Sequence, residues 1–284
     1  MAELLKGAAV AAALDEKTKE NCRILAEKGK VPTLTLIRVG EKEADLSYER
    51  NILKRCEKVG IRVDSKVFAE TVTTGELVEE IRKLNADPEV DGVLFFLPFP
   101  KAAGIDEKRV RETLAPEKDV DGCTPGSMAG VYSGNGVGYA PCTAQAAMEV
   151  LKYYQIPVAG KKAAVVGRSL VVGKPLAMLL LAENATVTVC HSRTEDLKAV
   201  TADAQILAAC IGKLEMIDAS YLGKDQIILD VGINWNEKIG RIAGDVKGED
   251  AERLAKAYTP VPGGIGGVTT SVLASHVAEA AMKR

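Results

Sequence analysis

The sequence predicts an α/β protein with two domains and parallel sheets, because short apolar strands alternate with helical segments along most of the chain. A second observation is the length, since 284 residues are too many for most single hydrophobic cores and suit two modest domains. A third is a glycine turn that joins an apolar strand to a helix in the second half of the chain.

The first helix is expected over residues 3–29, where apolar side chains recur on one face until Gly29 and Pro32 end the pattern. Further helices are expected, in chain order, at Glu43–Val59, Thr74–Asn85, Thr143–Tyr154, Gly173–Glu183 and Thr269–Lys283. Strands are expected where short runs alternate or are rich in β-branched residues. These runs are Thr33–Val39, Ile61–Phe68, Val90–Phe96, Ala163–Val166, Thr186–Cys190, Gln205–Ala209 and Gln226–Val231.

The composition is that of an ordinary globular protein, with 47% hydrophobic and 27% charged residues. The net charge of -2 argues against a general nucleic-acid binder, since there is no basic excess to neutralise phosphates. Apolar runs such as Gly7–Leu14 are far shorter than the roughly 20 residues of a membrane span. The N-terminus has no pattern of a targeting segment, so a cytoplasmic location is expected.

Six cysteines are scattered along the chain without a Cys-x-x-Cys pair, and there are only two histidines. Zinc sites and disulfide frameworks need closer groupings of such residues. We therefore expect no metal site, and we expect the cysteines to be reduced, structural thiols.

The most informative stretch is Val165–Pro175. Gly167 follows an apolar strand, so the backbone can turn sharply there and approach a pyrophosphate closely. The helix after Gly173 offers unpaired N–H groups and the positive end of its dipole to phosphates. The spacing differs from G-x-G-x-x-G, and an ordinary glycine turn is the alternative. A second strand that ends about 25 residues further on favours a Rossmann-like dinucleotide-binding domain, and therefore a redox enzyme.

The end of that second strand indicates which dinucleotide is bound. NAD sites usually carry Asp or Glu there to accept hydrogen bonds from the ribose hydroxyls, whereas this chain has His191-Ser192-Arg193. Arg168 also stands in the first turn. Two arginines and a serine suit a 2′-phosphate through charge-assisted hydrogen bonds, so we expect NADP instead of NAD.

Six further segments, in order, carry a resemblance to one family. They are Val39-Gly40 leading to Tyr48, Leu97-Pro98-Phe99-Pro100, Lys118-Asp119-Val120-Asp121-Gly122, Pro141-Cys142-Thr143, Asp230-Val231-Gly232-Ile233-Asn234 and Thr259-Pro260-Val261-Pro262-Gly263-Gly264. With the glycine turn, they make the chain resemble the methylenetetrahydrofolate dehydrogenase/cyclohydrolase family over most of its length. The resemblance implies an N-terminal α/β catalytic domain followed by a Rossmann-like dinucleotide-binding domain with a parallel sheet.

We place the folate-binding catalytic domain at residues 1–139 and the NADP-binding domain at residues 140–264. The boundary rests on Gly126–Gly138, a stretch rich in glycine and serine that is typical of an exposed connection. The topology and the resemblance imply that a C-terminal helix, residues 265–284, completes the first domain.

The resemblance also implies roles for individual residues. Tyr48 would stack along the aminobenzoyl ring of a tetrahydrofolate derivative, and the Asp121 carboxylate would hold its pterin, whose N–H donors suit a bidentate acceptor. Other folate-contacting positions are Leu97, Pro98, Pro262, Gly263 and Gly264. Positions expected to contact NADP are Thr143, Gly167, Arg168, Ser169, Val172, Ser192, Arg193 and Ile233.

Two departures from the family affect the expected hydrolysis. Bifunctional members carry lysine one helical turn after the tyrosine and glutamine before Leu-Pro-x-Pro, but here these catalytic positions are Ile52 and Phe96. The nearest lysine, Lys54, should lie about 240° round the helix from Tyr48. Hydride transfer requires alignment, whereas hydrolysis requires proton transfers. We therefore expect a dehydrogenase with weak or absent cyclohydrolase activity.

Three alternatives stay open. They are a bifunctional enzyme that uses Lys54 or another group, a non-catalytic folate-binding paralogue, and an enzyme for a different one-carbon substrate. The resemblance further implies a homodimer formed through the cofactor domain. No nucleic-acid or membrane partner is expected.

Overall fold

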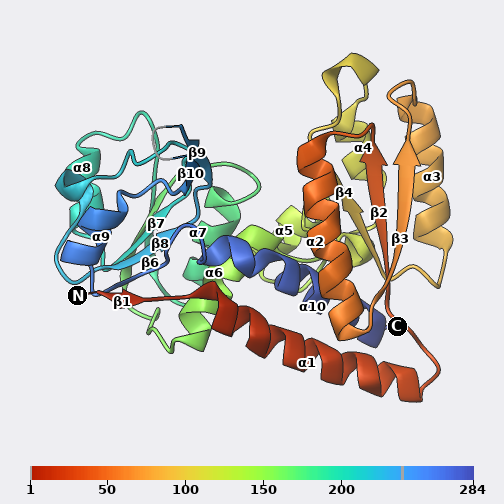
Figure 1. The fold of residues 1–284 in the computed structure, drawn as a ribbon, viewed down its shortest axis with the longest axis horizontal. Coiled ribbons are helices and arrows are strands. Elements are labelled where there is room, and N and C mark those ends of the chain that lie inside the picture. Colours follow the sequence, from red (N-terminus) through yellow and green to blue (C-terminus); the bar gives the residue numbers. More distant parts are fainter. Residues whose placement is uncertain (1, 238–239) are drawn as a thin grey trace. The chain divides into compact units, whose positions relative to one another are not determined.

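The structure is a computed structural model, and it describes residues 2–237 and 240–284 (Figure 1). The chain forms two compact units. Unit 1 contains the described residues up to Ala12 together with Thr143–Thr269, and unit 2 contains Ala13–Cys142 and Thr270–Arg284. Both units combine helices with a parallel sheet, which confirms the predicted α/β class.

Unit 1 is built on a parallel sheet. Among the described residues its strands follow the order β1-β11-β8-β7-β5-β6, and each neighbouring pair is parallel. The strands are β1 (Glu3–Leu4), β5 (Lys162–Val166), β6 (Thr186–Cys190), β7 (Ile206–Ala209), β8 (Ile227–Asp230) and β11 (Ala257–Tyr258). Strand β7 lies inside the sheet and is buried along its whole length, as expected for a strand with both faces covered.

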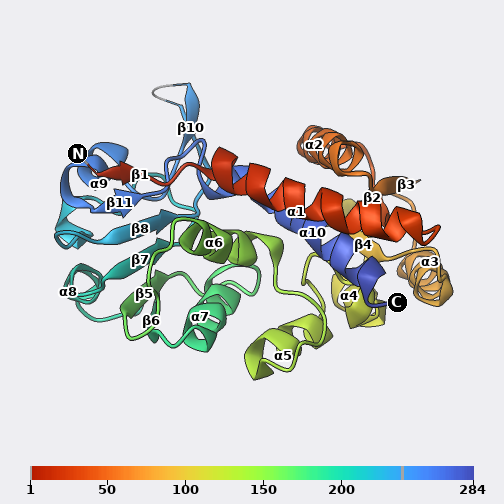
Figure 2. The ribbon, with the colours of Figure 1, turned by 90° about the horizontal axis from the view of Figure 1, so that it is seen from below.

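Helices lie on both sides of this sheet. Figures 1 and 2 show α6 and α7 on one side and α8 and α9 on the other. These helices are α6 (Cys142–Tyr153), α7 (Gly173–Ala182), α8 (Leu197–Ala202) and α9 (Gly248–Leu254). Because the strands are parallel, the carboxyl ends of β5, β6, β7 and β8 meet at one edge, where ligands bind in open α/β sheets.

A short antiparallel hairpin extends from unit 1 (Figure 2). It consists of β9 (Asn234–Asn236) and β10 (Arg241–Ala243). Trp235 and Ile242 lie opposite each other in its register, and both are exposed. The hairpin is not among the predicted elements, because its strands are too short to give a clear periodic pattern.

Unit 2 contains a smaller parallel sheet in the order β3-β2-β4. Its strands are β2 (Thr33–Val39), β3 (Arg62–Phe68) and β4 (Gly92–Phe95). The helices that lie wholly or mostly in this unit are α1 (Gly7–Glu27), α2 (Glu43–Val59), α3 (Thr74–Ala86), α4 (Glu107–Thr113), α5 (Pro125–Ser133) and α10 (Thr269–Met282). In the described part of the chain, no helix has the length and apolar character needed to cross a membrane.

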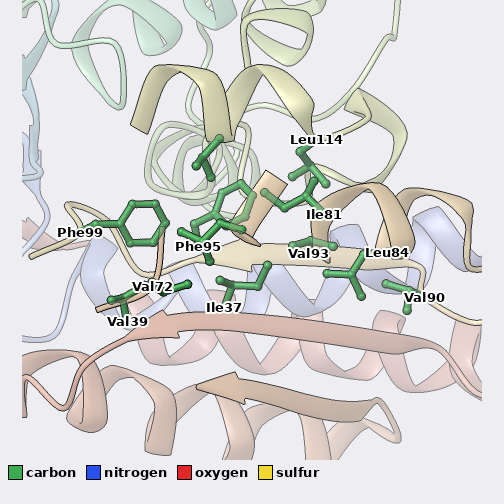
Figure 3. Close-up of a cluster of buried hydrophobic side chains, with 12 residues drawn as sticks. Ile37, Val39, Val72, Ile81, Leu84, Val90, Val93, Phe95, Phe99 and Leu114 are labelled. Carbon is green, nitrogen blue, oxygen red and sulfur yellow. The ribbon is translucent and has the colours of Figure 1, made fainter. Parts of the chain in front are cut away.

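The two faces of the unit 2 sheet carry different side chains. On one face, Ile37 of β2 and Phe95 of β4 join a buried cluster with α3 and α4, as Figure 3 shows. Successive side chains of a strand point to opposite faces, so Leu36 and Leu94 point away from that cluster. They are fully buried, as is Ile52 of α2.

The first predicted helix is wrong at its beginning. The helix α1 begins at Gly7 instead of residue 3. The preceding Glu3 and Leu4 form the edge strand β1, which pairs in parallel with β11. Two residues show no strand periodicity by themselves, and only pairing with a distant segment makes them a strand.

The expected exposed connection at Gly126–Gly138 is also wrong in part. The chain is helical from Pro125 to Ser133, and Gly130 is buried there. The side chain of Thr124 accepts a hydrogen bond from the backbone N–H of Ser127, and proline occupies the first turn. These capping features offset the weak helix propensity of the glycines in this stretch.

Candidate active site

Tyr48 and Phe96 meet in unit 2. Tyr48 lies on α2, one turn before Ile52, so the two side chains share a face of the helix. The half-buried ring of Tyr48 contacts Phe96 edge to face, with 6.0 Å between ring centroids and 76° between ring planes. Phe96 directly follows β4, and its backbone N–H donates to the carbonyl of Ile37 in β2 (3.0 Å). The structure therefore brings together the position predicted to stack on folate and one of the two positions predicted to decide hydrolysis.

The positions expected to decide hydrolysis are apolar and closed to water. Ile52 is 0% exposed and Phe96 is 5% exposed. Lys54 is exposed, and its place on α2 is about 240° round the helix from Tyr48, or about 120° by the shorter way, as the helical spacing predicts. This helix face therefore presents a tyrosine and an isoleucine, without the amine of Lys54.

An ion pair anchors α2 beside Tyr48. The next residue, Glu49, pairs with Arg38 of β2 (Nε–Oε2 2.9 Å), and both side chains are buried. Ser65 of β3 donates its hydroxyl to the other Glu49 oxygen (2.5 Å). Because both charges are partnered, the pair fixes α2 against β2 and β3 at the level of Tyr48. No sequence motif points to these residues, because isolated charges on separate elements form no recognisable pattern.

Asp121 lies in a loop that Asp119 holds in place. One carboxylate oxygen of Asp119 accepts from the Cys123 N–H (3.0 Å), and the other accepts from the Thr124 N–H (2.7 Å). Asp119 is fully buried, and its backbone bridges to Val93 of β4. The carboxylate of Asp119 therefore has a structural role, because it orders the loop that carries the Asp121 carboxylate.

The electrostatics around Asp121 favour its protonated form. Burial raises the pKa of Asp121 to about 7, and the charge of Asp119 adds to the rise, whereas the neighbouring Cys142 opposes it. Burial, together with the Asp121 charge, also raises the pKa of Tyr48 well above its ordinary value. A carboxyl group whose pKa is near 7 can donate or accept a proton at neutral pH.

The folate positions expected after β4 follow Phe96 directly. Leu97 is half-buried and Pro98 is exposed, and a cis peptide bond joins them. The backbone N–H of the next residue, Phe99, donates to the Glu107 carboxylate (3.0 Å). This bond connects the segment after β4 to the first turn of α4.

The other expected folate positions, Pro262, Gly263 and Gly264, belong to unit 1. Pro262 and Gly263 are exposed, and Gly263 has a φ of +102°, which favours glycine. The Gly263 carbonyl accepts from the Gly7 N–H (2.8 Å). A Cβ at Gly264 would lie 2.5 Å from the Pro260 carbonyl oxygen, so this turn has no room for a side chain there.

The turn after β5 requires glycine at two positions. Gly167 has a φ of +124°, and a Cβ there would lie 2.2 Å from the carbonyl oxygen of Cys210. A Cβ at Gly173 would lie 2.2 Å from the Gly167 carbonyl oxygen. The hydroxyl of Ser169 accepts from the backbone N–H groups of Val172 (3.1 Å) and Gly173 (3.4 Å). The turn therefore brings together the predicted cofactor positions between β5 and α7.

The predicted phosphate-binding side chains follow two neighbouring strands. Arg168 follows β5, and Ser192 and Arg193 follow β6, which pairs with β5 in parallel. All three side chains are exposed. The backbone N–H of Arg193 donates to Nδ1 of His191 (3.1 Å), so this imidazole orders the turn.

The last two predicted cofactor positions lie elsewhere in unit 1. Thr143 is half-buried in the first turn of α6, and Ile233 is exposed after β8. Asp245 orders the loops near Ile233, because it accepts from three successive backbone N–H groups of residues 211–213 and from the Asn234 amide, at 2.6 to 3.0 Å. Asp245 is a structural residue that no motif in the sequence identified.

A parallel sheet with helices on both sides and a glycine turn between β5 and α7 defines the class of dinucleotide-binding α/β proteins. Residues 5–121 match the catalytic domain of the tetrahydrofolate dehydrogenase/cyclohydrolase family, and residues 141–284 match its NAD(P)-binding domain. The chain therefore belongs to the tetrahydrofolate dehydrogenase/cyclohydrolase family.

Individual relatives are similar over the whole chain. The bifunctional protein FolD of Clostridium kluyveri is 47% identical over 99% of this chain and 98% of its own. The crystal structure of bifunctional FolD, a methylenetetrahydrofolate dehydrogenase/cyclohydrolase from Campylobacter jejuni, matches with a TM-score of 0.96 and 36% identity over 100% of both chains. The Trypanosoma brucei dehydrogenase-cyclohydrolase, solved with NADP cofactor and an inhibitor, matches with a TM-score of 0.91 and 30% identity over 99% of this chain and 98% of that chain.

Proposed function

We propose that this enzyme oxidises 5,10-methylenetetrahydrofolate to 5,10-methenyltetrahydrofolate with NADP, and that its cyclohydrolase activity is weak or absent. Family membership supports the NADP-dependent dehydrogenase, and the T. brucei relative was solved with NADP. One observation carries the second part of the proposal. The two positions at which the family resemblance leads us to expect lysine and glutamine hold the buried, apolar Ile52 and Phe96.

We assign NADP to unit 1. The turn after β5 fits a dinucleotide, because Gly167 and Gly173 allow the start of α7 to pack closely against the strand end. The exposed Arg168, Ser192 and Arg193 would hold the 2′-phosphate by charge-assisted hydrogen bonds. When bound, NADP supplies the acceptor of the hydride.

We assign folate recognition mainly to unit 2. The half-buried ring of Tyr48 would stack along the aminobenzoyl group, and Asp121 would accept hydrogen bonds from the pterin. With the substrate aligned, the lone pair of its nitrogen expels hydride from the methylene carbon, and no side chain has to move a proton in this step. The dehydrogenase therefore needs only groups that this chain retains.

Hydrolysis makes a different demand. Water must add to the methenyl carbon, the ring must then open, and both events require proton transfers. Isoleucine and phenylalanine can neither donate nor accept a proton. Because a positioned acid–base group contributes about 10²–10⁴ in rate, its loss should leave little enzymatic hydrolysis.

The double variant Ile52→Lys with Phe96→Gln tests this proposal. We expect methenyltetrahydrofolate decay, followed by its absorbance, to rise at least about tenfold above that of the parent. The matched control is Ile52→Met with Phe96→Leu, which alters both positions without adding a polar group. No gain in a double variant that retains dehydrogenase activity would contradict the assigned role of the pair.

A second candidate function is a bifunctional enzyme in which Asp121 transfers the protons. The relatives in C. kluyveri and C. jejuni are named as bifunctional, and burial raises the pKa of Asp121 to about 7. Parent hydrolysis well above the buffer blank would support this candidate. We expect Lys54→Ala to leave both activities within about twofold of the parent, because Lys54 is exposed on a different side of α2.

We also propose that the enzyme is cytoplasmic and that it forms a homodimer, and the family resemblance supports the homodimer. Sedimentation analysis tests the oligomeric state directly. A mass of twice that of one chain is expected, and a mass of one chain at assay concentration would contradict the dimer.

A further inference from the structure

His276 of α10 is a buried residue that the proposed reaction does not use. Its Nδ1 lies 2.9 Å from the carbonyl oxygen of Val120. A carbonyl oxygen carries no hydrogen, so Nδ1 must be the protonated nitrogen that donates in this bond. Val120 precedes Asp121, so His276 binds the peptide group that leads into the carboxylate assigned to the pterin.

Two neighbours help to fix this arrangement. The thiol of Cys142 donates to the same Val120 carbonyl (3.4 Å), and its sulfur lies 3.8 Å from Nδ1 of His276. The ring of Tyr139 packs against the imidazole, with 4.9 Å between centroids and 36° between planes. The Val120 carbonyl therefore accepts two side-chain donors, and a ring contact holds one of those donors in place.

The position of Asp121 follows from these contacts. A peptide group is planar, so fixing the Val120 carbonyl also fixes the adjoining Cα of Asp121. On the far side of Asp121, the Asp119 carboxylate holds the backbone N–H groups of Cys123 and Thr124. Hydrogen bonds therefore restrain the chain both before and after Asp121.

We infer that His276 is a positioning residue, which holds the Asp121 carboxylate in the orientation that receives the pterin. The inference rests on the proposed role of Asp121 in folate binding. His276 acts through the Val120 peptide group and does not itself touch the substrate. Its loss should therefore weaken folate binding more than it changes NADP binding or the hydride step.

The variants His276→Leu and His276→Asn separate a hydrogen bond from packing. Leucine removes the donor, whereas the asparagine amide keeps an N–H at a similar position. We expect His276→Leu to raise the KM for methylenetetrahydrofolate about tenfold, with kcat and the KM for NADP within about twofold of the parent. His276→Asn should restore the folate KM to within about threefold. Val277→Ala, at a buried neighbouring position in α10, controls for lost packing.

The possible results distinguish a failure of this inference from a failure of the proposed function. Equal folate KM values for the parent and His276→Leu would overturn the inference, as would equal rises in the leucine and asparagine variants or in Val277→Ala. If His276→Leu does not fold, His276→Phe removes the donor to Val120 but keeps a ring against Tyr139, and an unchanged folate KM there would also overturn the inference. A parent without NADP reduction would instead refute the proposed function, so the two failures are distinguishable.

Discussion

The glycine turn of unit 1 and the Tyr48 face of α2 in unit 2 specify their chemistry by different means. At the turn, backbone geometry decides, because Gly167 has a φ of +124° and a Cβ at Gly173 would lie 2.2 Å from a carbonyl oxygen. On α2, side-chain identity decides. The helix propensities of isoleucine and lysine differ by only a fraction of about 0.7 kcal/mol, so exchanging these residues at position 52 changes the available chemistry while the helix persists.

This difference between the glycine turn and the Tyr48 face would allow hydrolysis to be lost while dehydrogenation is kept. A change at the turn would disturb the backbone that we propose holds NADP, and dehydrogenation and cofactor binding would fail together. A change at Ile52 or Phe96 affects only the supply of a proton-transferring group. The proposed loss of hydrolysis therefore requires no rebuilding of either unit.

The largest effect, on the KM for NADP, is expected from Gly173→Ala. The added Cβ would meet the backbone of Gly167 at 2.2 Å and that of Arg168 at 3.0 Å, so the turn must open. We expect the KM for NADP to rise at least about 100-fold, measured by steady-state reduction of NADP. Gly248→Ala is the matched control, because a Cβ there meets nothing within 4 Å. An NADP KM within about twofold of the parent would show that the turn does not hold the cofactor.

A smaller effect is expected when Arg168 and Arg193 are both changed to alanine. The backbone of the turn should be unaltered, because both side chains are exposed. Loss of the charge-assisted bonds to a 2′-phosphate should raise the KM for NADP about 30-fold, with little change in the KM for NAD. Lys198→Ala removes an exposed cation from α8 as the control for net charge. An unaltered NADP KM in the double variant would refute the phosphate site.

The smallest effect is a change in how stability depends on pH. Burial raises the pKa of Asp121 from its usual value of 3.8 to about 7. Between these values the folded protein holds a proton that the unfolded chain has released, so this group contributes stability that is lost as pH rises from about 4 to about 7. Asp121→Asn removes that contribution. As pH rises over this range, the Tm of the variant should therefore fall less than the Tm of the parent. The difference between the two falls should be a few degrees.

Thermal unfolding at several pH values from 4 to 7 measures this difference. The Asp121→Asn variant should still lose some stability as pH rises, because burial also raises the pKa of Asp230 in unit 1 to about 7. Asp230 accepts backbone N–H groups from Gly232, Asp245 and Val246, so its own replacement would not be a clean control. Identical pH profiles for the parent and Asp121→Asn would contradict the raised pKa.

Elements with a strong local signal could be predicted closely from the sequence. Strand β2 and helix α2 have the predicted bounds, and α2 is capped at its C-terminal end by Gly60, whose φ of +85° suits glycine. The strand β1 could not be predicted, because it exists only through pairing with β11 near the other end of the chain. The helix α5 was missed because its cap at Thr124 competes with a glycine-rich composition.

The candidate site likewise contains some residues that the sequence predicts and others that it does not. Motifs with ordered spacing identified Tyr48, Asp121 and the glycine turn as candidates, and the helical period correctly separated Lys54 from Tyr48. The supporting contacts were not predictable. Arg38 with Glu49 join separate elements, and His276 reaches Val120 from a distant helix, so only the folded chain reveals them.

The most direct test of the central claim is the decay of methenyltetrahydrofolate with purified parent enzyme, compared with a buffer blank. The same preparation must first reduce NADP with methylenetetrahydrofolate, which establishes that it is active. We predict rapid NADP reduction with methenyl decay no faster than the blank. Decay well above the blank would contradict this prediction, because hydrolysis would then proceed without the lysine and glutamine that the family resemblance leads us to expect at positions 52 and 96.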